Sequence, residues 1–248
     1  MLKITFLGTN GWFDSNTGNT PSVLIEHRNY YIILDAGNGI SKLRNCISSD
    51  KPVYLFLSHF HLDHISGLHT LPLNKFSKGL YIIVPKGGTK LINQFVNVPF
   101  TVPIKKLPFK TEIIEACNKL NFLPFKATFL PLVHSSYVLG IRLEIDSKTI
   151  SYCTDTSYCF NAITLAKNAD LLISECSMKP LGTDDASVHL NPELASKIAK
   201  EAGAKKLMLI HFDAAKYLTL DDRKKAELAA KTIFNNSYAS YDDLELQV

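Results

Sequence analysis

Short runs of apolar, β-branched and aromatic residues recur along the whole chain, and polar segments rich in turn-forming residues separate them. Runs of this length are typical of strands, and those without alternation are typical of strands buried on both faces. The predicted strands are 3–8, 22–27, 30–37, 53–58, 80–85, 127–134, 139–145, 149–155, 169–175, 206–211 and 241–248.

Segments with helical spacing lie between these strands. Asn191 is predicted to cap a helix that begins at Pro192 and ends at Gly203. Thr219 and Asp222 form a second capping signal for a helix that runs to about residue 235. Shorter helices are predicted near 38–46, 64–69, 87–97, 110–118 and 160–168.

Many strands with scattered helices predict two packed sheets with helices outside. Residues 1–248 are long enough for one large domain of this kind, and no repeat or linker divides them. The segment 97–126 is interrupted by four prolines and is predicted to be a surface excursion.

Composition places the chain among ordinary globular proteins, with 46% hydrophobic and 20% charged residues. The net charge of +4 tolerates an anionic substrate but is too small to indicate nucleic-acid binding alone. The first residues lack the features of a signal peptide, and no apolar stretch approaches the ~18 residues that a membrane span requires. We therefore expect a cytoplasmic protein without a membrane partner.

The five cysteines form no CxxC pair. In a protein without a secretion signal, they are expected to be reduced and mostly buried thiols. A zinc–cysteine site is the alternative interpretation.

The stretch LFLSHFHLDH, residues 55–64, places four ionisable side chains directly after an apolar strand. Burying such groups without partners is costly, so something must compensate them. His59 and His61 point the same way in an extended chain and can hold one metal, while Asp63 and His64 lie past the bend and can face a second. Histidine and carboxylate ligands suit zinc, and also manganese or iron.

Three further predicted strands end at ligand-type residues, namely His134, Asp155 and His211. Because the carboxyl ends of parallel strands meet at one edge of a sheet, these side chains can converge on one crevice. We expect two zinc ions with a hydroxide between them. One ion would be bound by His59, His61 and His134, the other by Asp63, His64 and His211, with Asp155 bridging both.

The motif HFHLDH, followed by His134, Asp155 and His211, resembles the metallo-β-lactamase superfamily and, more narrowly, the ribonuclease Z group of phosphodiesterases. The likeness extends to FLGTNG, LDAGNG, CTDT and ISECSM, and to VHLNPELASKIAKEAGAKKLMLIHF. It implies an α/β (α+β) fold, a four-layer αββα sandwich of two mixed β-sheets with outer helices. A dinuclear metal centre is expected at one edge, and the resemblance also suggests a homodimer.

The resemblance also implies residue roles. His189 would contact the scissile phosphate and protonate the leaving oxygen, Glu175 would orient it, and Asp63 would also take a proton from the nucleophilic water. Ligating histidines donate their other N–H to a neighbouring group. The expected supports are Asp35 in LDAG, Ser58 before His59 and Thr154 before Asp155, with Gly37 and Gly39 serving a tight turn near the metals.

The loop 8–22 is rich in Gly, Asn, Ser and Thr and could offer backbone N–H groups to a phosphate. Two of its residues, Trp12 and Phe13, would stack on a base or close a pocket. The alternative is that they take part in ordinary hydrophobic packing.

The predicted function is therefore that of a metal-dependent phosphodiesterase. The long RNA-gripping arm of ribonuclease Z is missing, because the interval from His134 to Asp155 holds only a hairpin. This favours a small or cyclic phosphodiester over RNA. The alternatives are a lactonase or thioesterase with the same centre, a ribonuclease Z-type endoribonuclease and, because all seven ligands are present, less readily a non-enzymatic scaffold.

Overall fold

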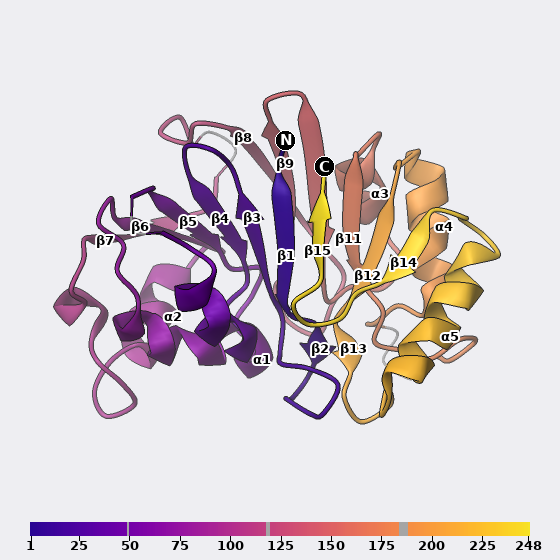
Figure 1. Ribbon diagram of the computed structural model, residues 1–248, viewed down its shortest axis with the longest axis horizontal. Helices are drawn as coiled ribbons and strands as arrows, with labels where there is room; N and C mark the ends of the chain where they lie inside the picture. Colours follow the sequence, from indigo (N-terminus) through magenta and orange to yellow (C-terminus); the bar gives the residue numbers. More distant parts are fainter. Residues whose placement is uncertain (49, 118–119, 184–187) are drawn as a thin grey trace.

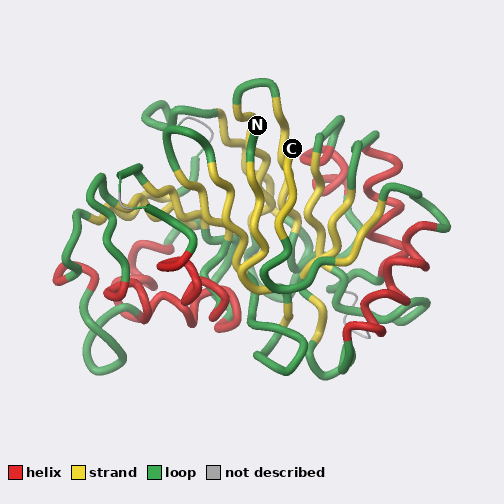
Figure 2. The backbone as a smooth tube through the Cα atoms, viewed as in Figure 1, coloured by secondary structure: helices red, strands yellow, loops and turns green. Residues whose placement is uncertain are grey.

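Two large β-sheets pack face to face, with helices on both outer sides, in a computed structural model that describes residues 1–48, 50–117, 120–183 and 188–248. Figure 1 shows the four layers edge-on, and Figure 2 shows the strands enclosed between two groups of helices. The predicted four-layer αββα architecture is confirmed.

The first sheet has seven strands, and its mixed character follows from its connections. β1 pairs antiparallel with β15 and β3, whereas β4, β5, β6 and β7 run parallel. In order across the sheet, the strands are β15 (Glu245–Gln247), β1 (Lys3–Gly8), β3 (Ser22–Glu26), β4 (Tyr31–Leu34), β5 (Val53–Phe56), β6 (Leu80–Val84) and β7 (Thr111–Glu115).

The second sheet has six strands, and a further pair of short strands joins the two halves. β14, β12, β11 and β10 are parallel, while β9 is antiparallel to both β10 and β8. The strands are β14 (Ser237–Ala239), β12 (Leu207–Ile210), β11 (Leu171–Glu175), β10 (Lys148–Cys153), β9 (Leu139–Ile145) and β8 (Lys126–Pro131), with β2 (Asn10–Gly11) and β13 (Phe212–Asp213) as the separate pair.

Both faces of the central strands are buried, which explains their continuous apolar runs. In β5, Tyr54 and Phe56 point into the core between the sheets, whereas Val53 and Leu55 pack under the outer helices. A third apolar cluster, which includes Leu172 and Leu209, fills the space between the second sheet and its helices. The polar residues that follow these strands are therefore forced to the ends of the sandwich.

The outer helices end where their capping residues predict. Asn191 accepts a hydrogen bond from the Leu194 N–H, Gly203 closes the same helix at a φ of 65°, and Thr219 forms a capping box with Asp222. The helices are η1 (Asn38–Asn45), α1 (Leu62–Ile65), η2 (Ser66–Leu73), α2 (Gly88–Phe95) and η3 (Ile104–Lys106) on the first sheet, with α3 (Phe160–Ala166), α4 (Pro192–Ala202) and α5 (Leu220–Lys231) on the second.

The helix predicted at 110–118 is wrong. Residues Thr111–Glu115 form β7, which pairs along its whole length with β6 and completes the first sheet. The segment 97–126 is therefore an excursion only in part, because it also supplies a strand. The short strands β2, β13 and β14 were not predicted either.

Cys46, Cys153, Cys159 and Cys176 are thiols, in agreement with the expected reduced state. Cys153 and Cys176 are buried, but Cys46 and Cys117 are exposed, so the expectation of mostly buried thiols was wrong. Within the described ranges, every helix is too short or too polar to cross a lipid bilayer.

Candidate metal centre

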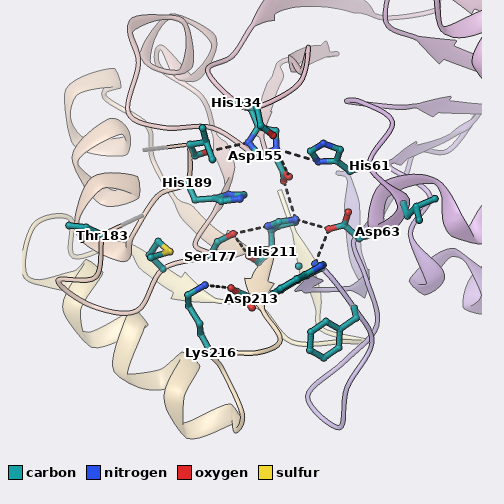
Figure 3. Close-up of a pocket in the computed structure, with 17 residues that line it drawn as sticks. His61, Asp63, His134, Asp155, Ser177, Thr183, His189, His211, Asp213 and Lys216 are labelled. Carbon is teal, nitrogen blue, oxygen red and sulfur yellow. Dashed lines mark hydrogen bonds and ion pairs between the residues drawn. The ribbon is translucent and has the colours of Figure 1, made fainter. Parts of the chain in front are cut away.

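The ends of four strands meet at one end of the sandwich, on the side away from the two termini (Figure 1). His59, His61, Asp63 and His64 follow β5, and α1 begins within this stretch. The second sheet supplies three more side chains at the carboxyl ends of parallel strands, His134 after β8, Asp155 after β10 and His211 after β12. The two halves of the chain thus face each other across the site (Figure 3).

In the described part of the chain, two groups of ligand-type atoms lie within 4.8 Å of one another. One group contains His59, His61, His134 and Asp155, and the other contains Asp63, His64 and His211. A third group overlaps both and contains Asp155, His189 and His211. The first two groups bring together the residues of the two predicted sets, whereas the third adds His189, which was predicted to contact the substrate.

Asp155 lies between the two groups. Its Oδ2 is 3.4 Å from His59 Nε2 and 3.6 Å from His134 Nε2, while its Oδ1 is 3.1 Å from His211 Nε2. One oxygen therefore faces each group, the arrangement that a bridging carboxylate requires.

Two buried nitrogens in this cluster, His59 Nε2 and His64 Nε2, have no hydrogen-bond partner within the described part of the chain. Such atoms are costly to bury unless something else binds them. Imidazole nitrogens and carboxylate oxygens at this spacing suit zinc, manganese or iron. The residues present therefore suit the binding of metal ions.

Neighbouring groups orient the imidazoles so that their Nε2 lone pairs face the cluster. Ser58 Oγ lies 3.0 Å from His59 Nδ1, Asp35 Oδ2 lies 2.7 Å from His64 Nδ1, and Ser177 Oγ lies 2.9 Å from His211 Nδ1. Because Ser58 donates its own proton to Asp35, its oxygen accepts from the ring. This fixes the tautomer that a metal ligand needs.

Asp35 is the centre of this support. Its carboxylate accepts hydrogen bonds from the Ser58 N–H at 2.7 Å and from the Tyr152 hydroxyl at 2.9 Å, in addition to its contact with His64. Thr154, the third predicted support, donates to Asp155 Oδ1 at 2.9 Å. All three predicted supporting residues therefore touch a member of the cluster.

Three residues of the site adopt left-handed backbone conformations although they are not glycine. The φ angles are 59° for Asp35, 50° for Asp155 and 59° for His211. Each such residue costs about 1–3 kcal/mol and persists only where surrounding contacts hold it. Backbone strain of this kind concentrates at functional sites, and here it directs the side chains inward.

Three histidines of the cluster are kept neutral. Burial lowers the pKa of His59, His61 and His134. A neutral imidazole offers the lone pair that a metal ion binds.

The remaining four ligand-type side chains are electrostatically coupled. Burial opposes protonation of His64 and His211, but the facing carboxylates outweigh it and raise the pKa of both rings. Burial also disfavours ionised Asp63 and Asp155, yet the facing imidazoles hold the pKa of each carboxyl below its usual range. Both carboxylates are therefore ionised and available as ligands.

His189 lies beside the cluster, just before α4. Its ring centroid is 5.0 Å from that of His134 and 6.0 Å from that of His211. Glu175, fully buried at the end of β11, accepts from His189 Nδ1 at 3.0 Å and also from the Thr156 N–H at 2.6 Å. The structure therefore brings together the two residues predicted to act as a pair.

A pocket of about 850 Å³ opens over the cluster and is lined by His61, Asp63, His134, Asp155, His189 and His211. Its remaining wall includes Trp12, Phe13, Leu62, Asp213 and Lys216.

The loop 8–22 was expected to offer backbone N–H groups to a phosphate. One of them, the Trp12 N–H, instead donates a hydrogen bond to Asp63 Oδ2 at 2.8 Å. Gly37 was expected to serve a tight turn. Its main role is to let the backbone of Asp63 pack closely against it, because a Cβ at Gly37 would collide with the Asp63 carbonyl.

Several contacts of the site escaped prediction. Ser177 and Tyr152 support the cluster through single hydroxyl groups, and the Val188 carbonyl accepts from His134 Nδ1 at 3.2 Å. Ser177 lies in the ISECSM segment, and this position was the one feature of the sequence that could have identified it as a supporting residue. A single tyrosine inside a strand, such as Tyr152, has no sequence feature that indicates such a role.

The profile of the Beta-lactamase superfamily domain matches residues 30–212. The probable metallo-hydrolase YhfI of Bacillus subtilis (strain 168) is 31% identical over 240 residues, covering 94% of each chain. Its crystal structure superposes with a TM-score of 0.82 over the full length of both chains.

A ribonuclease Z from Microcystis aeruginosa is 28% identical in an alignment of 309 positions, covering all of this chain and 96% of the relative. The short form of human tRNase Z, 20% identical, has the same fold, with a TM-score of 0.77 over 99% of each chain. The chain therefore belongs to the β-lactamase superfamily, is related to metallo-hydrolases and ribonuclease Z, and carries a His/Asp cluster suited to binding metal ions.

Proposed function

We propose that this protein is a dinuclear metal-dependent phosphodiesterase that acts on a small phosphodiester. His59, His61 and His134 would hold one divalent cation, and Asp63, His64 and His211 the other, with Asp155 shared. Zinc is the first candidate, and manganese or iron would suit the same donors. Two buried imidazole nitrogens, His59 Nε2 and His64 Nε2, support this proposal, because each faces an Asp155 oxygen yet forms no hydrogen bond within the described part of the chain.

Two cations in such a site lower the pKa of water and neutralise charge that develops on phosphate oxygens. The chain's own groups set the geometry for this chemistry. Asp63 Oδ2 is held by the Trp12 N–H and faces His211 Nε2 at 3.2 Å, so an ionised carboxylate lies at the mouth of the cluster. It can accept a proton from a bound water there.

His189 is the observation that favours phosphate chemistry. Its Nδ1 is engaged by Glu175, and the residue lines the pocket, where its ring can approach a substrate. An imidazole in this position can donate a proton to the departing oxygen, and its charged form attracts a phosphate oxygen. A carboxylic ester needs less help of this kind, because its transition state carries less negative charge.

The alignments support a small substrate. The match to ribonuclease Z extends over 309 positions, although this chain has 248 residues, so ribonuclease Z contains segments without a counterpart here. The match to YhfI needs no such additions, at 240 positions and 94% coverage of both chains. A site without those segments is better suited to a small or cyclic phosphodiester than to RNA.

The test compares hydrolysis of bis(p-nitrophenyl) phosphate with hydrolysis of a panel of lactones and thioesters, with zinc or manganese added. We expect phosphodiester turnover, and we expect His189→Ala to reduce kcat by about 10²–10⁴-fold without changing metal content. His69→Ala is the matched control, because His69 is exposed and its Nδ1 lies 2.6 Å from the Ser66 carbonyl, outside the cluster. Turnover of carboxyl esters alone would overturn the proposal in favour of a lactonase or thioesterase.

A further inference from the structure

The chain has one tryptophan, Trp12, and it lies at the wall of the pocket instead of in the core. Its side chain is 68% exposed, and that of its neighbour Phe13 is 45% exposed. Leu62, which is also exposed, lines the same pocket. An apolar aromatic wall beside a cluster of metal-ligating groups is a combination that phosphate binding alone does not require.

The position of Trp12 is fixed from several directions. Its N–H donates to Asp63 Oδ2, and its φ of 75° is left-handed, which is strained for a residue with a bulky side chain. On its N-terminal side, Asn10 and Gly11 form β2 and pair with β13 directly after His211. A Cβ at Gly11 would lie 2.6 Å from the His211 ring, so the loop is packed against the cluster itself.

Hydrogen bonds inside the loop connect its two sides. The Asn10 amide donates to the Gly18 carbonyl at 2.7 Å and to Ser15 Oγ at 3.0 Å. The exposed Trp12 is therefore carried by a loop that is cross-linked by its own side chains.

The two rings are arranged so that an indole face stays available. Trp12 and Phe13 meet edge to face, with centroids 5.8 Å apart and planes at 60°. Among the described residues, no other aromatic ring contacts Trp12. Flat faces of this kind stack on nucleobases, whichever base is offered.

We propose that Trp12, backed by Phe13, is a stacking platform for the base of a nucleoside phosphodiester, of which a nucleoside cyclic phosphate is the simplest. This inference rests on the proposed phosphodiesterase function and names its substrate class. The base would lie on the indole while the phosphate reaches the metal-ligating cluster in the same pocket of about 850 Å³. That volume lies in the range of small-molecule sites and is far larger than one phosphate needs.

Intrinsic fluorescence tests the platform directly, because Trp12 is the only indole in the chain. We would titrate the protein with a nucleoside monophosphate, with ribose 5-phosphate and with inorganic phosphate. The nucleotide is expected to quench the emission saturably, whereas the two ligands without a base are not. Equal responses to all three ligands, or no saturable response to the nucleotide, would overturn the inference.

Kinetics with a nucleoside cyclic phosphate and a base-free cyclic ribose phosphate provide the second readout. Trp12→Ala is expected to raise KM about 10-fold for the nucleoside substrate only, with kcat and metal content changed little, and Trp12→Tyr should retain most of the affinity. Phe100→Ala, in an exposed loop away from the pocket, is the control. If Trp12→Ala hydrolysed the nucleoside substrate with the same KM as wild type, the stacking role would be refuted, but the phosphodiesterase function would not. If wild type hydrolysed no phosphodiester at all, the proposed phosphodiesterase function itself would be refuted.

Discussion

The buried guanidinium of Arg223 donates a hydrogen bond to the side-chain oxygen of Asn10, which lies 213 positions earlier in the chain. The same guanidinium donates to Thr9 Oγ1 at 2.7 Å and to the Thr17 carbonyl at 3.1 Å, and it stacks over the Phe212 ring. One side chain of α5 therefore organises the loop that carries Trp12. Burial lowers the pKa of Arg223 to about 10, so it still carries its charge at neutral pH.

Replacing Arg223 by Met should destabilise the protein and release the loop. The substitution leaves several buried acceptors without donors, so we expect the free energy of unfolding to fall by about 2–4 kcal/mol. Urea denaturation measures the change, and Trp12 emission reports on the loop. Arg44→Met, at an exposed arginine, should have almost no effect. Equal losses in the two variants would contradict the structural role of Arg223.

Metal analysis of the purified protein tests the ligand assignment. Wild type reconstituted with zinc is expected to hold two equivalents, His134→Ala about one, and Asp155→Ala less still, because Asp155 faces both groups. The fold should survive in His134→Ala, since the change removes one imidazole from the pocket wall, and circular dichroism would verify this. His69→Ala should retain both equivalents. Full occupancy in Asp155→Ala would contradict a shared ligand.

Metal affinity should rise with pH. The carboxylates raise the pKa of His64 and His211, so below those raised values both rings hold the proton that a metal ion must displace. Affinity is therefore expected to fall as the pH is lowered from about 8 to 6, with protons released on binding. Competition titrations against a chelator of known pH dependence measure the first effect, and calorimetry in buffers of different ionisation enthalpy measures the second. Affinity that does not change over this range would show that these rings are not ligands.

Glu175 should act on the reaction through His189, as a positioning residue. Glu175→Gln keeps an oxygen for the Thr156 N–H but removes the charge beside the imidazole, and we expect kcat to fall about 10–100-fold with metal content unchanged. Because a carboxylate favours the charged form of its neighbour, the alkaline limb of the kcat profile should move to lower pH. Glu201→Gln, at an exposed glutamate of α4, is the control. A lower rate with an unchanged pH profile would indicate a purely structural role.

The central sheets and the two groups of ligand-type residues could be predicted for the same reason. Strands buried on two faces are mostly apolar, so a run of polar residues after one marks the end of the sandwich. His59 after β5 and Asp155 after β10 are such residues. The parallel strands of the second sheet bring Asp155 and His211 to one edge, and the packing of the two sheets places them opposite His59.

The strand at Thr111–Glu115 could not be recognised in this way. Glu112 and Glu115 have helical spacing, and the residues of β7 are only half buried, as is usual at the edge of a sheet. Strand pairing with β6 decides the conformation, and such pairing is not visible in a local pattern. The bond between Arg223 and Asn10 was hidden for the same reason, because its partners meet only in the folded chain.

The pairing of the last strand with the first also has a consequence for biosynthesis. β15 pairs with β1, and His211 contacts Asp63 across 148 intervening positions. A nascent chain on the ribosome therefore has an open first sheet and an incomplete second group of candidate ligands until both His211 and β15 have been made. Under the proposed function, the chain can hold its full set of metal ions only after that point in its synthesis.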